Sequence, residues 1–307
     1  MKTSPFFPQA RLLVRALPFV YQEECFALKG GTAINLFVRD LARLSVDIDL
    51  VYLPIQDRPT SLRGIHDALQ RIAENVRHAL PGVHVHEYKP RGDRLVAKLD
   101  LQARDGVQIK IEPNDVLRGT IYPVDERTIS PKAMELFEQS ATARVVSLAD
   151  LYGGKICAAL DRQHPRDLFD VHLLFQNEGL TEEIRKAFVV YLASHDRPMN
   201  ELLTPNRKNI TKTYEDDFAG MAVTSVPLSA LLETREKLIS AINSDLTTAE
   251  REFLLSVKLK EPKWDLLSLP GIDRLPGPQW KLYNLRKMKP EKHSEAAVRL
   301  RKKLGLS

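Results

Sequence analysis

Residues 28–52 read LKGGTAINLFVRDLARLSVDIDLVY, and this run carries the strongest signal for the architecture. It opens on a short apolar strand that enters two glycines, continues at helical spacing, and ends in a β-forming stretch that contains Asp47 and Asp49. In a strand, residues i and i+2 point to the same face, with α-carbons roughly 6.5–7 Å apart. Two like charges placed in this way repel each other and cost stability unless a cation lies between them. The run therefore predicts a cation-binding strand.

The glycine segment KGGT (residues 29–32) lies where the first strand meets the helix. Glycines let a backbone approach a phosphate closely, and the amides of a first helical turn point toward such an anion. Gly-Gly before a helix is more often an ordinary turn, and Glu112 in QIKIEPN (108–114) could be an acid at the end of an edge strand. Together with Asp47 and Asp49, however, these residues supply the hard oxygens that Mg²⁺ prefers. Two such ions about 3.5–4 Å apart can assist an in-line displacement at phosphorus.

The composition is that of an ordinary globular protein, with 307 residues of which 43% are hydrophobic and 28% are charged. This length is sufficient for one large core or two modest domains. Cys25 and Cys157 are far apart and cannot build a disulfide framework or a zinc cluster, which predicts a reducing cytoplasm. Prolines and arginines interrupt residues 1–20, so we expect no signal peptide. No apolar run approaches the ~20 residues needed to cross a bilayer, and no membrane partner is expected.

The charge is concentrated at the C-terminal end. The chain has a formal net charge of +5, and residues 281–307 contain nine Lys and Arg residues against Glu291 and Glu295. The rest of the chain is therefore close to neutral. A basic end on a near-neutral body indicates that this end binds a polyanion. A solvated helical face explains the same pattern equally well, and both interpretations stay open.

The apolar spacing divides the chain into a mixed half and a helical half. Strands are predicted at residues 25–29, 46–54, 83–88, 94–102 and 107–113, the last two joined by a hairpin turn at Asp105–Gly106. Helices are predicted at residues 9–23, 32–41, 61–80, 147–161, 165–176 and 181–193, with three more from about residue 225. We therefore predict an α+β fold: an α/β domain with a mixed sheet in residues 1–145, followed by a mainly helical domain in residues 146–307.

The run over residues 28–52 resembles the first motif of the AbiEii/AbiGii toxin family of nucleotidyltransferases. This family includes the MenT toxins and belongs to the DNA polymerase β-like nucleotidyltransferase superfamily. IKIEPN (109–114) is similar to the second motif, and LYGGKICAALDRQHPRDLFDVHLL (151–174) to the third and fourth. LPGPQWKLYNLRKM (275–288) also resembles the C-terminal part of these proteins. The resemblance spans most of residues 26–175, with its motifs in order.

The resemblance implies a polymerase β-like nucleotidyltransferase that uses Mg²⁺ or Mn²⁺. The implied metal ligands are Asp47, Asp49 and Glu112. The implied catalytic residues are Asp47, Asp49, Lys155 and Asp170, with Asp170 as the candidate base. The implied nucleotide-binding residues are Lys29, Gly30, Gly31, Thr32, Arg43, Ser45 and Lys155. Further candidates are Lys110, Arg166 and Asp167. Thr32 stands where the superfamily usually has serine, which keeps the hydroxyl.

Ser45 lies on the same strand face as Asp47. A phosphate on Ser45 would add a charge of about −1.5 to −2 beside the acids. We expect such phosphorylation, by a partner kinase or an antitoxin, to silence the enzyme.

Several of these residues also have purely structural explanations. Lys155 could be an exposed helix lysine. Asp167 and Asp170 fall in the first turn of a helix, where acids complement the helix dipole. Arg166 could simply pair with Asp170 at the i,i+4 spacing.

The resemblance implies a toxin of a type IV-like toxin–antitoxin or phage-defence pair. The enzyme would transfer a nucleoside monophosphate from an NTP to an acceptor hydroxyl at the 3′ end of tRNA and so block translation. The implied partners are the NTP, the tRNA and a cognate antitoxin, all in the cytoplasm. Two alternatives stay open: nucleotidylation of a protein, and a nucleotide- or RNA-binding module without catalysis.

Overall fold

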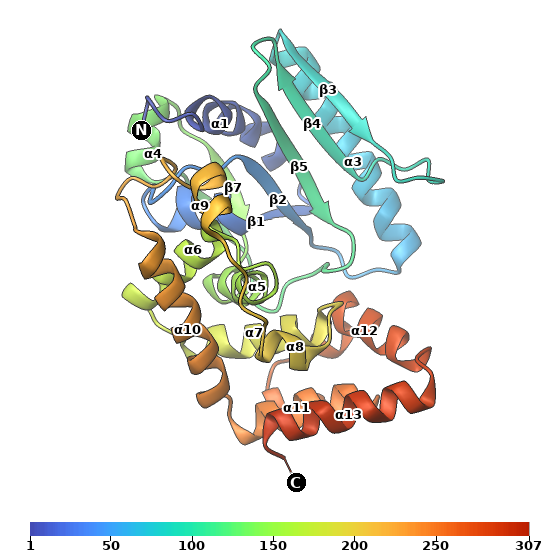
Figure 1. Ribbon diagram of the computed structural model, residues 1–307. Helices are drawn as coiled ribbons and strands as arrows, with labels where there is room; N and C mark the ends of the chain where they lie inside the picture. The colour runs from blue at the N-terminus through green and yellow to red at the C-terminus, as the bar shows by residue number, and fades with distance from the viewer. Residues whose placement is uncertain (307) are drawn as a thin grey trace. The chain divides into compact units, whose positions relative to one another are not determined.

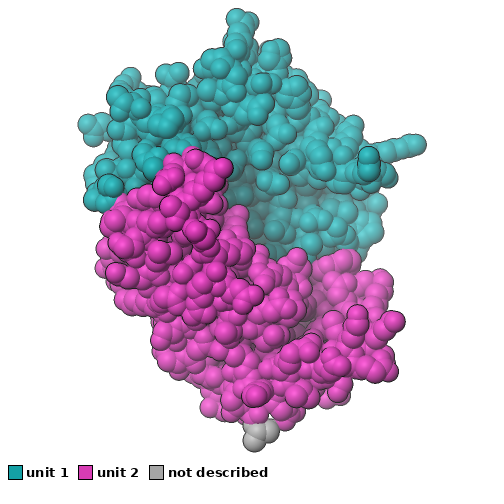
Figure 2. All heavy atoms as spheres, in the orientation of Figure 1, with its two compact units in different colours: residues 1–147, 217–225 teal, residues 148–216, 226–307 magenta. Residues whose placement is uncertain are grey.

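The computed structural model describes residues 1–306 and shows an α+β protein, as the sequence predicts (Figure 1). Ser307, the last residue of the basic C-terminal segment, lies outside the described residues. The chain forms two compact units (Figure 2): unit 1 comprises residues 1–147 and 217–225, and unit 2 comprises residues 148–216 and 226–307. The sequence places a boundary after residue 145 and gives no sign that residues 217–225 return to unit 1.

Unit 1 is built on one mixed sheet with the strand order β3-β4-β5-β2-β1-β7-β6. The strands are β1 (Phe26–Lys29), β2 (Asp47–Tyr52), β3 (Val83–Tyr88), β4 (Lys98–Ala103), β5 (Gln108–Asn114), β6 (Asp125–Thr128) and β7 (Thr142–Val145). β1 pairs antiparallel with β2, and β2 pairs parallel with β5. β4 and β5 form the predicted hairpin, whose turn uses Gly106 at a φ of +84°. β2 therefore lies between β1 and β5.

One face of this sheet is apolar and is covered by helices (Figure 1). The helices of unit 1 are α1 (Phe7–Tyr21), α2 (Gly30–Thr32), the π-helix η1 (Ala33–Val38), α3 (Arg58–Ala79) and α4 (Pro131–Phe137). α1 and α3 contact each other and the sheet. Leu50, Leu99 and Ile111, from three neighbouring strands, are fully buried on this face. Burial of each such side chain stabilises the fold by about 1.5–3 kcal/mol.

The opposite face of the same strands carries polar residues, because paired residues of neighbouring strands point to the same side. The first row, here named the Asp49 row, contains Lys29, Asp49 and Glu112 in register, and the alternation of β4 adds Lys98 with its partner Tyr88. The second row, here named the Asp47 row, contains Asp47, Lys110, Asp100 and His86. The acids of residues 45–52 therefore lie on the polar side of the sheet.

Three elements of unit 1 are not visible in the apolar spacing: β6, α4 and β7. β6 is the polar segment DERT and β7 has four residues, so neither is long enough to show an alternating pattern. These strands form because β1 offers a free edge to β7, and β7 then pairs with β6. The helix predicted at 32–41 begins earlier, at Gly30, and becomes π-helical from Ala33.

Unit 2 is helical, as the sequence predicts for the region after residue 145. Its helices are α5 (Leu148–Asp161), α6 (Pro165–Gln176), α7 (Glu182–Ser194), α8 (Met199–Leu203), α10 (Leu228–Ser244), α11 (Thr248–Lys258), α12 (Pro276–Arg286) and α13 (Pro290–Leu304), with α9 (Thr211–Asp217) at the passage to unit 1 and the 3₁₀ turns η2 (Trp264–Leu267) and η3 (Ile272–Arg274). Residues 226–306 contain four α-helices, where the spacing predicts three. The helix break expected at Pro165 is confirmed: α5 ends at Asp161, and Gln163 adopts a φ of +53° before α6 begins.

The α5–α7 contact depends on a glycine. A β-carbon on Gly153 would lie 2.8 Å from Cβ of Ala187 and 2.9 Å from the backbone nitrogen of Phe188, both on α7. The neighbouring Gly154 has room, because a β-carbon there would lie 3.9 Å from Cε1 of Tyr191. The close packing of the two helices therefore requires a glycine at position 153. It does not require one at position 154.

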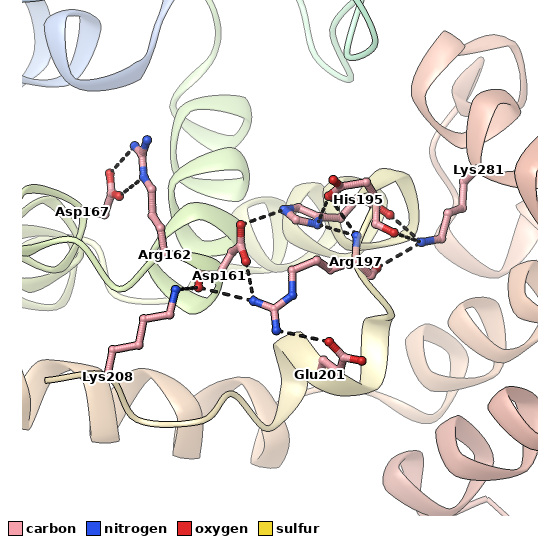
Figure 3. Close-up of polar contacts among 9 residues, drawn as sticks. Asp161, Arg162, Asp167, His195, Arg197, Glu201, Lys208 and Lys281 are labelled. Atoms are coloured by element: carbon pink, nitrogen blue, oxygen red, sulfur yellow. Dashed lines mark hydrogen bonds and ion pairs between the residues drawn. The ribbon is translucent and has the colours of Figure 1, made fainter.

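The basic C-terminal segment is folded. α12 and α13 bury Leu282, Leu285, Leu300 and Leu304. Lys281 is buried as well, and its Nζ donates to the backbone carbonyls of residues 195–197 at 2.5–3.3 Å (Figure 3). Lys281 is therefore not available to a polyanion, although the charge count includes it. The exposed basic residues of these helices and their joint are Arg286, Lys287, Lys289, Lys292, Arg299, Arg301 and Lys302. Within residues 1–306, no helix combines the length and apolarity needed to cross a bilayer.

Candidate active site

In unit 1, the carboxylate of Asp49 lies against the bend at Gly30. Gly30 has a φ of +70°, which glycine adopts at little cost. A β-carbon on Gly30 would overlap Oδ2 of Asp49, so this carboxylate points toward the bend. Lys29 is the partner of Asp49 across the β1–β2 pair. The bend and the acid therefore form one polar corner at the end of β1.

Thr32 connects the bend to the segment that leads into β2. Its Oγ1 donates to the carbonyl oxygen of Asp47 at 2.6 Å and lies 2.7 Å from Oγ of Ser45. Thr32 is fully buried, and Ser45 is 6% exposed. These hydroxyls hold the start of β2 against the bend, so phosphorylation of Ser45 would require this contact to open.

Arg43 packs against the other glycine of the bend. Its guanidinium occupies the space that a β-carbon on Gly31 would need, and Nη1 donates to the carbonyl oxygen of Leu44 at 2.9 Å. Residues 217–225 cover this position, since Arg43 forms a β-bridge with Ala222 and the Leu44 amide donates to the carbonyl oxygen of Met221 at 2.9 Å. Arg43 is only 2% exposed, so it brings a buried positive charge next to the bend. Direct contact with a triphosphate stays a prediction.

Asp47, Asp49 and Glu112 share the polar face of the sheet. Asp47 and Asp49 are partly buried and alternate with the fully buried Ile48 on β2. Glu112 is exposed and pairs with Asp49 across the parallel β2–β5 ladder. Lys110, also exposed, pairs with Asp47 in the same ladder. The structure thus brings the three predicted acids onto two neighbouring strands.

These acids fit a hard divalent cation whose ligand shell a nucleotide completes. Across residues 1–306, no three His, Cys, Asp or Glu side chains gather closely enough to hold a metal ion by themselves. Mg²⁺ usually takes one or two carboxylates from a protein, and substrate phosphates and waters supply the remaining ligands. Asp47 and Asp49 lie on one face of β2, with the Asp49 carboxylate packed against the Gly30 bend, and they meet this requirement. Ligation by Glu112 stays a prediction.

In unit 2, Lys155 and two aspartates form a buried cluster. Nζ of Lys155 on α5 lies 2.8 Å from Oδ1 of Asp167 and 3.0 Å from Oδ2 of Asp170, both on α6. The three side chains are 6%, 1% and 0% exposed. The helix break at Pro165 makes the cluster possible, because it folds α6 back along α5. The explanation of Lys155 as an exposed helix lysine is therefore wrong.

Arg162, whose side chain is largely exposed, binds Asp167 of the same cluster (Figure 3). Its Nε and Nη2 donate to the two carboxylate oxygens of Asp167 at 2.5 and 3.0 Å, while its side chain is 62% exposed. Burial alone would raise the pKa of Asp167, but the charge of Lys155 and the hydrogen bond and charge of Arg162 outweigh burial. They hold the pKa of Asp167 well below its usual range. Asp167 therefore stays ionised and compensates the buried charge of Lys155.

Arg166, the remaining candidate of unit 2, lies in the first turn of α6. Its backbone nitrogen donates to Nδ1 of His164, which caps the helix. The side chain of Arg166 is partly buried. The structure thus places Lys155, Asp167 and Asp170 together and leaves Arg166 at the helix start.

Sequence reasoning missed two features that lie beside the acids of unit 1. The first is the segment 217–225, which has no motif that would connect it to Arg43. The second is the pair Tyr88 and Lys98, which extends the Asp49 row. The alternation of β3 and β4 places both residues on one face, but only the strand register shows that this face carries Asp49.

The comparison with solved structures identifies the fold. Seven chains of solved structures match. One is MenT4, a nucleotidyltransferase toxin from Mycobacterium tuberculosis H37Rv, with a TM-score of 0.59 and 15% sequence identity over 95% of this chain and 92% of that chain. At this identity the likeness shows that the two chains share a fold, and no more. No curated protein matches the chain by sequence.

The sequence itself gives the family. A family model described as "Nucleotidyl transferase AbiEii toxin, Type IV TA system" matches residues 11–267. Because this span is more than half of the chain, the protein belongs to this family of nucleotidyltransferase toxins of type IV toxin–antitoxin systems. Membership implies a nucleotide substrate and an antitoxin partner. The resemblance to this family seen in residues 28–52, 109–114 and 151–174 is thereby confirmed. Residues 275–288 lie outside the matched span, so the resemblance seen there stays a prediction.

Proposed function

We propose that the protein transfers a nucleoside monophosphate from an NTP to the 3′ hydroxyl of a tRNA and blocks translation as part of phage defence. A bond forms between the acceptor oxygen and the α-phosphorus. The bond from that phosphorus to the oxygen bridging to the β-phosphorus breaks, pyrophosphate leaves, and the hydroxyl proton passes to a base. The contact between Asp49 and the Gly30 bend carries this proposal, because it puts a cation-binding acid beside a phosphate-binding turn.

Unit 1 supplies the metal and triphosphate ligands in this proposal. Asp47 and Asp49 hold Mg²⁺ or Mn²⁺, with Glu112 as the third acid. A bound divalent cation would neutralise the charge that develops on the phosphates. The residues that bind the triphosphate are Lys29, Gly30, Gly31 and Thr32. Ser45 contacts Thr32 and Arg43 packs against Gly31, so both adjoin this binding segment. Lys110, the strand partner of Asp47, lies in position to balance the charge of that acid.

Unit 2 supplies a cation and a base. In this proposal the buried Lys155–Asp170 ion pair opens when substrate binds, so that Lys155 binds the triphosphate and Asp170 accepts the proton of the acceptor hydroxyl. Asp167 and Arg162 act through Lys155 as positioning residues, since both bind the cluster that fixes its ammonium group. Arg166 is a further cation for the phosphates.

An RNA acceptor agrees with the exposed basic side of α12 and α13. Phosphate contacts give affinity without sequence readout, and the single-stranded end of an RNA is accessible to a transferase. The seven exposed basic residues of this surface provide such contacts. The proposal places the reaction in the cytoplasm, where NTPs and tRNA are found.

The test supplies each labelled NTP to the protein with total cell RNA and total cell protein. The expected result is label in tRNA, activity that EDTA removes and Mg²⁺ restores, and a loss of at least about 100-fold in Asp47→Asn. Asp67→Asn is the matched control, because Asp67 is an exposed acid on α3, the helix that covers the opposite face of the sheet. Label in protein would favour protein nucleotidylation. Growth arrest that survives Asp47→Asn would favour a binding module without catalysis.

A further inference from the structure

The exposed side of α12 carries two aromatic rings that the function proposed above does not use. Trp280 is 39% exposed and Tyr283 is 46% exposed, and their rings stack with centroids 5.3 Å apart and planes 22° apart. Nζ of Lys287 lies 4.1 Å from the centroid of the Tyr283 ring. Single exposed apolar residues are common on protein surfaces, whereas a stacked pair with a cation over one ring is an organised surface.

The helical spacing explains why these three side chains gather on one side. Residues three and four apart lie on the same face of a helix, so Trp280, Tyr283 and Lys287 form one row, here named the aromatic row. The other side of α12 is buried through Leu282 and Leu285. The aromatic row is therefore the side of α12 that does not pack into unit 2.

The buried Lys281 fixes the rotation of α12 and so the direction of the aromatic row. Lys281 follows Trp280 directly, and its Nζ donates to the backbone carbonyls of residues 195–197 at 2.5–3.3 Å (Figure 3). These carbonyls follow α7, which packs against α5, the helix that carries Lys155. The rings are thus held in place before any ligand binds, which lowers the cost of ordering them on binding.

The charge around the aromatic row is positive. Residues 274–290 contain five Lys and Arg residues and no Asp or Glu, and Arg286, Lys287 and Lys289 are exposed. Exposed rings beside cations complement a chain that carries both bases and phosphates, because every base has a face that can stack on an aromatic ring. A duplex would match the charge, but its bases are already stacked on one another. The chemistry of the row therefore favours a single-stranded nucleic acid.

We propose that the aromatic row binds the bases of a single-stranded segment of RNA, while the cations beside it bind the phosphates of the same segment. A base stacks on Trp280 or Tyr283, and Lys287 and Lys289 contact the backbone. The proposal rests on the proposed function, in which α12 and α13 contact an RNA acceptor through phosphates alone. The aromatic row adds selection, because it favours single-stranded RNA over a duplex and over a polyanion without bases.

Tryptophan fluorescence tests the occupant without any turnover. The chain has two tryptophans, and Trp264→Phe leaves Trp280 as the only indole while it keeps a ring beside Phe253. We expect a single-stranded RNA of about 12 nucleotides to quench the Trp280 fluorescence of this full-length variant to saturation. The same RNA annealed to its complement, and inorganic polyphosphate, should quench little at equal phosphate concentration.

Two results of this titration would overturn the proposal. The first is an unchanged Trp280 signal with the single strand, or equal quenching by polyphosphate, since either would mean that no base stacks on the ring. The second is quenching by poly-L-glutamate and not by the RNA, which would assign the aromatic row to an acidic protein partner.

Affinity measurements separate base stacking from charge. Trp280→Ala is expected to lower the affinity for the single strand at least about fivefold, the lower end of one lost base stack. The slope of log K against log salt should stay at the wild-type value, because a base stack releases no counterions. Trp280→Phe keeps a ring and should retain most of the affinity. Val298→Ala is the matched control, because Val298 is a 63% exposed apolar residue of α13 next to Arg299. An equal loss in Val298→Ala, or no loss in Trp280→Ala, would contradict the proposal.

The two proposals fail in different ways. If the wild-type protein transfers nucleotides to RNA but the single strand leaves the Trp280 signal unchanged, the aromatic row is not an RNA site and the transferase activity stands. If the wild-type protein labels no RNA while the single strand quenches Trp280 and Trp280→Ala weakens binding, the row binds RNA and the transferase proposal is wrong.

Discussion

Gly30 combines two constraints at one α-carbon: a positive φ and contact with the carboxylate of Asp49. Gly30→Ala is expected to lower nucleotidyl transfer by about 100-fold, since a displacement of a reacting group by roughly 1 Å has this effect. Gly106→Ala is the control, because Gly106 has a similar φ and its β-carbon would contact no described atom within 4 Å. Both variants bear the same backbone cost of about 1–2 kcal/mol. Equal activity in the two would show that the Asp49 contact is irrelevant.

Asp167 gives the Lys155 cluster a pH dependence. Its pKa in the folded protein lies below the ordinary value of 3.8, so unfolding in acid takes up a proton. The stabilisation by Asp167 is therefore complete well above that value and is lost as the pH falls below it. Asp167→Asn is expected to lower the free energy of unfolding by about 3 kcal/mol near neutral pH. Urea titrations between about pH 6 and about pH 3 should show this difference shrinking toward acid. A constant difference would contradict the ionised state.

The sequence predicts which side chains belong to the candidate site better than it predicts whether those side chains are buried. Arg43, Ser45 and Lys155 are predicted to face substrate or solvent, and all three are buried. Their burial depends on contacts with distant segments: residues 217–225 for Arg43, and α6 for Lys155. Apolar periodicity reports the face of one element, so it cannot report a cover that comes from elsewhere in the chain.

Among the helices, the α5–α7 pair offers a sharp comparison of neighbouring glycines. Gly153→Ala is expected to destabilise the protein by about 1–3 kcal/mol, because the new methyl group would overlap α7. Gly154→Ala is expected to stabilise it by about 0.5–1 kcal/mol, because alanine favours the helix and the methyl group fits beside Tyr191. Thermal unfolding of the two variants measures both effects. Shifts of the same sign would show that the helices do not pack as closely as described.

How well the sequence predicts a strand depends on the length of the strand and on its partners in the sheet. β2, β3 and β5 have six or seven residues with clear apolar alternation, and the structure confirms all three within two residues. The predicted strand at 94–102 begins only at Lys98, because the preceding residues form the loop beside α3, where the amide of Val96 donates to Nδ1 of His66 at 3.0 Å. β6 and β7 owe their existence to sheet partners, which no local pattern reveals.

For the chain as a whole, the basic charge of α12 and α13 sets how salt should act on RNA binding. Removal of residues 281–307 would also remove Leu282, Leu285, Leu300 and Leu304 from the core, so truncation cannot isolate the charge. Substitution of exposed residues can isolate the effect of the charge. A triple variant that changes Lys287, Lys289 and Lys292 to Gln removes three positive charges and leaves the buried side intact.

The measurement is the affinity for single-stranded RNA between about 50 and about 200 mM salt, plotted as log K against log salt. Each lost phosphate contact on a single strand reduces the slope by about 0.7, so the triple variant is expected to flatten it by about 2. The matched control changes Lys212, Lys237 and Lys263 to Gln, which removes the same charge at exposed positions outside residues 281–307. If only the first variant flattens the slope, the RNA binds on α12 and α13, because only residues that contact phosphates contribute to counterion release. Equal slopes in both variants would reduce the effect to net charge and exclude a defined RNA surface there.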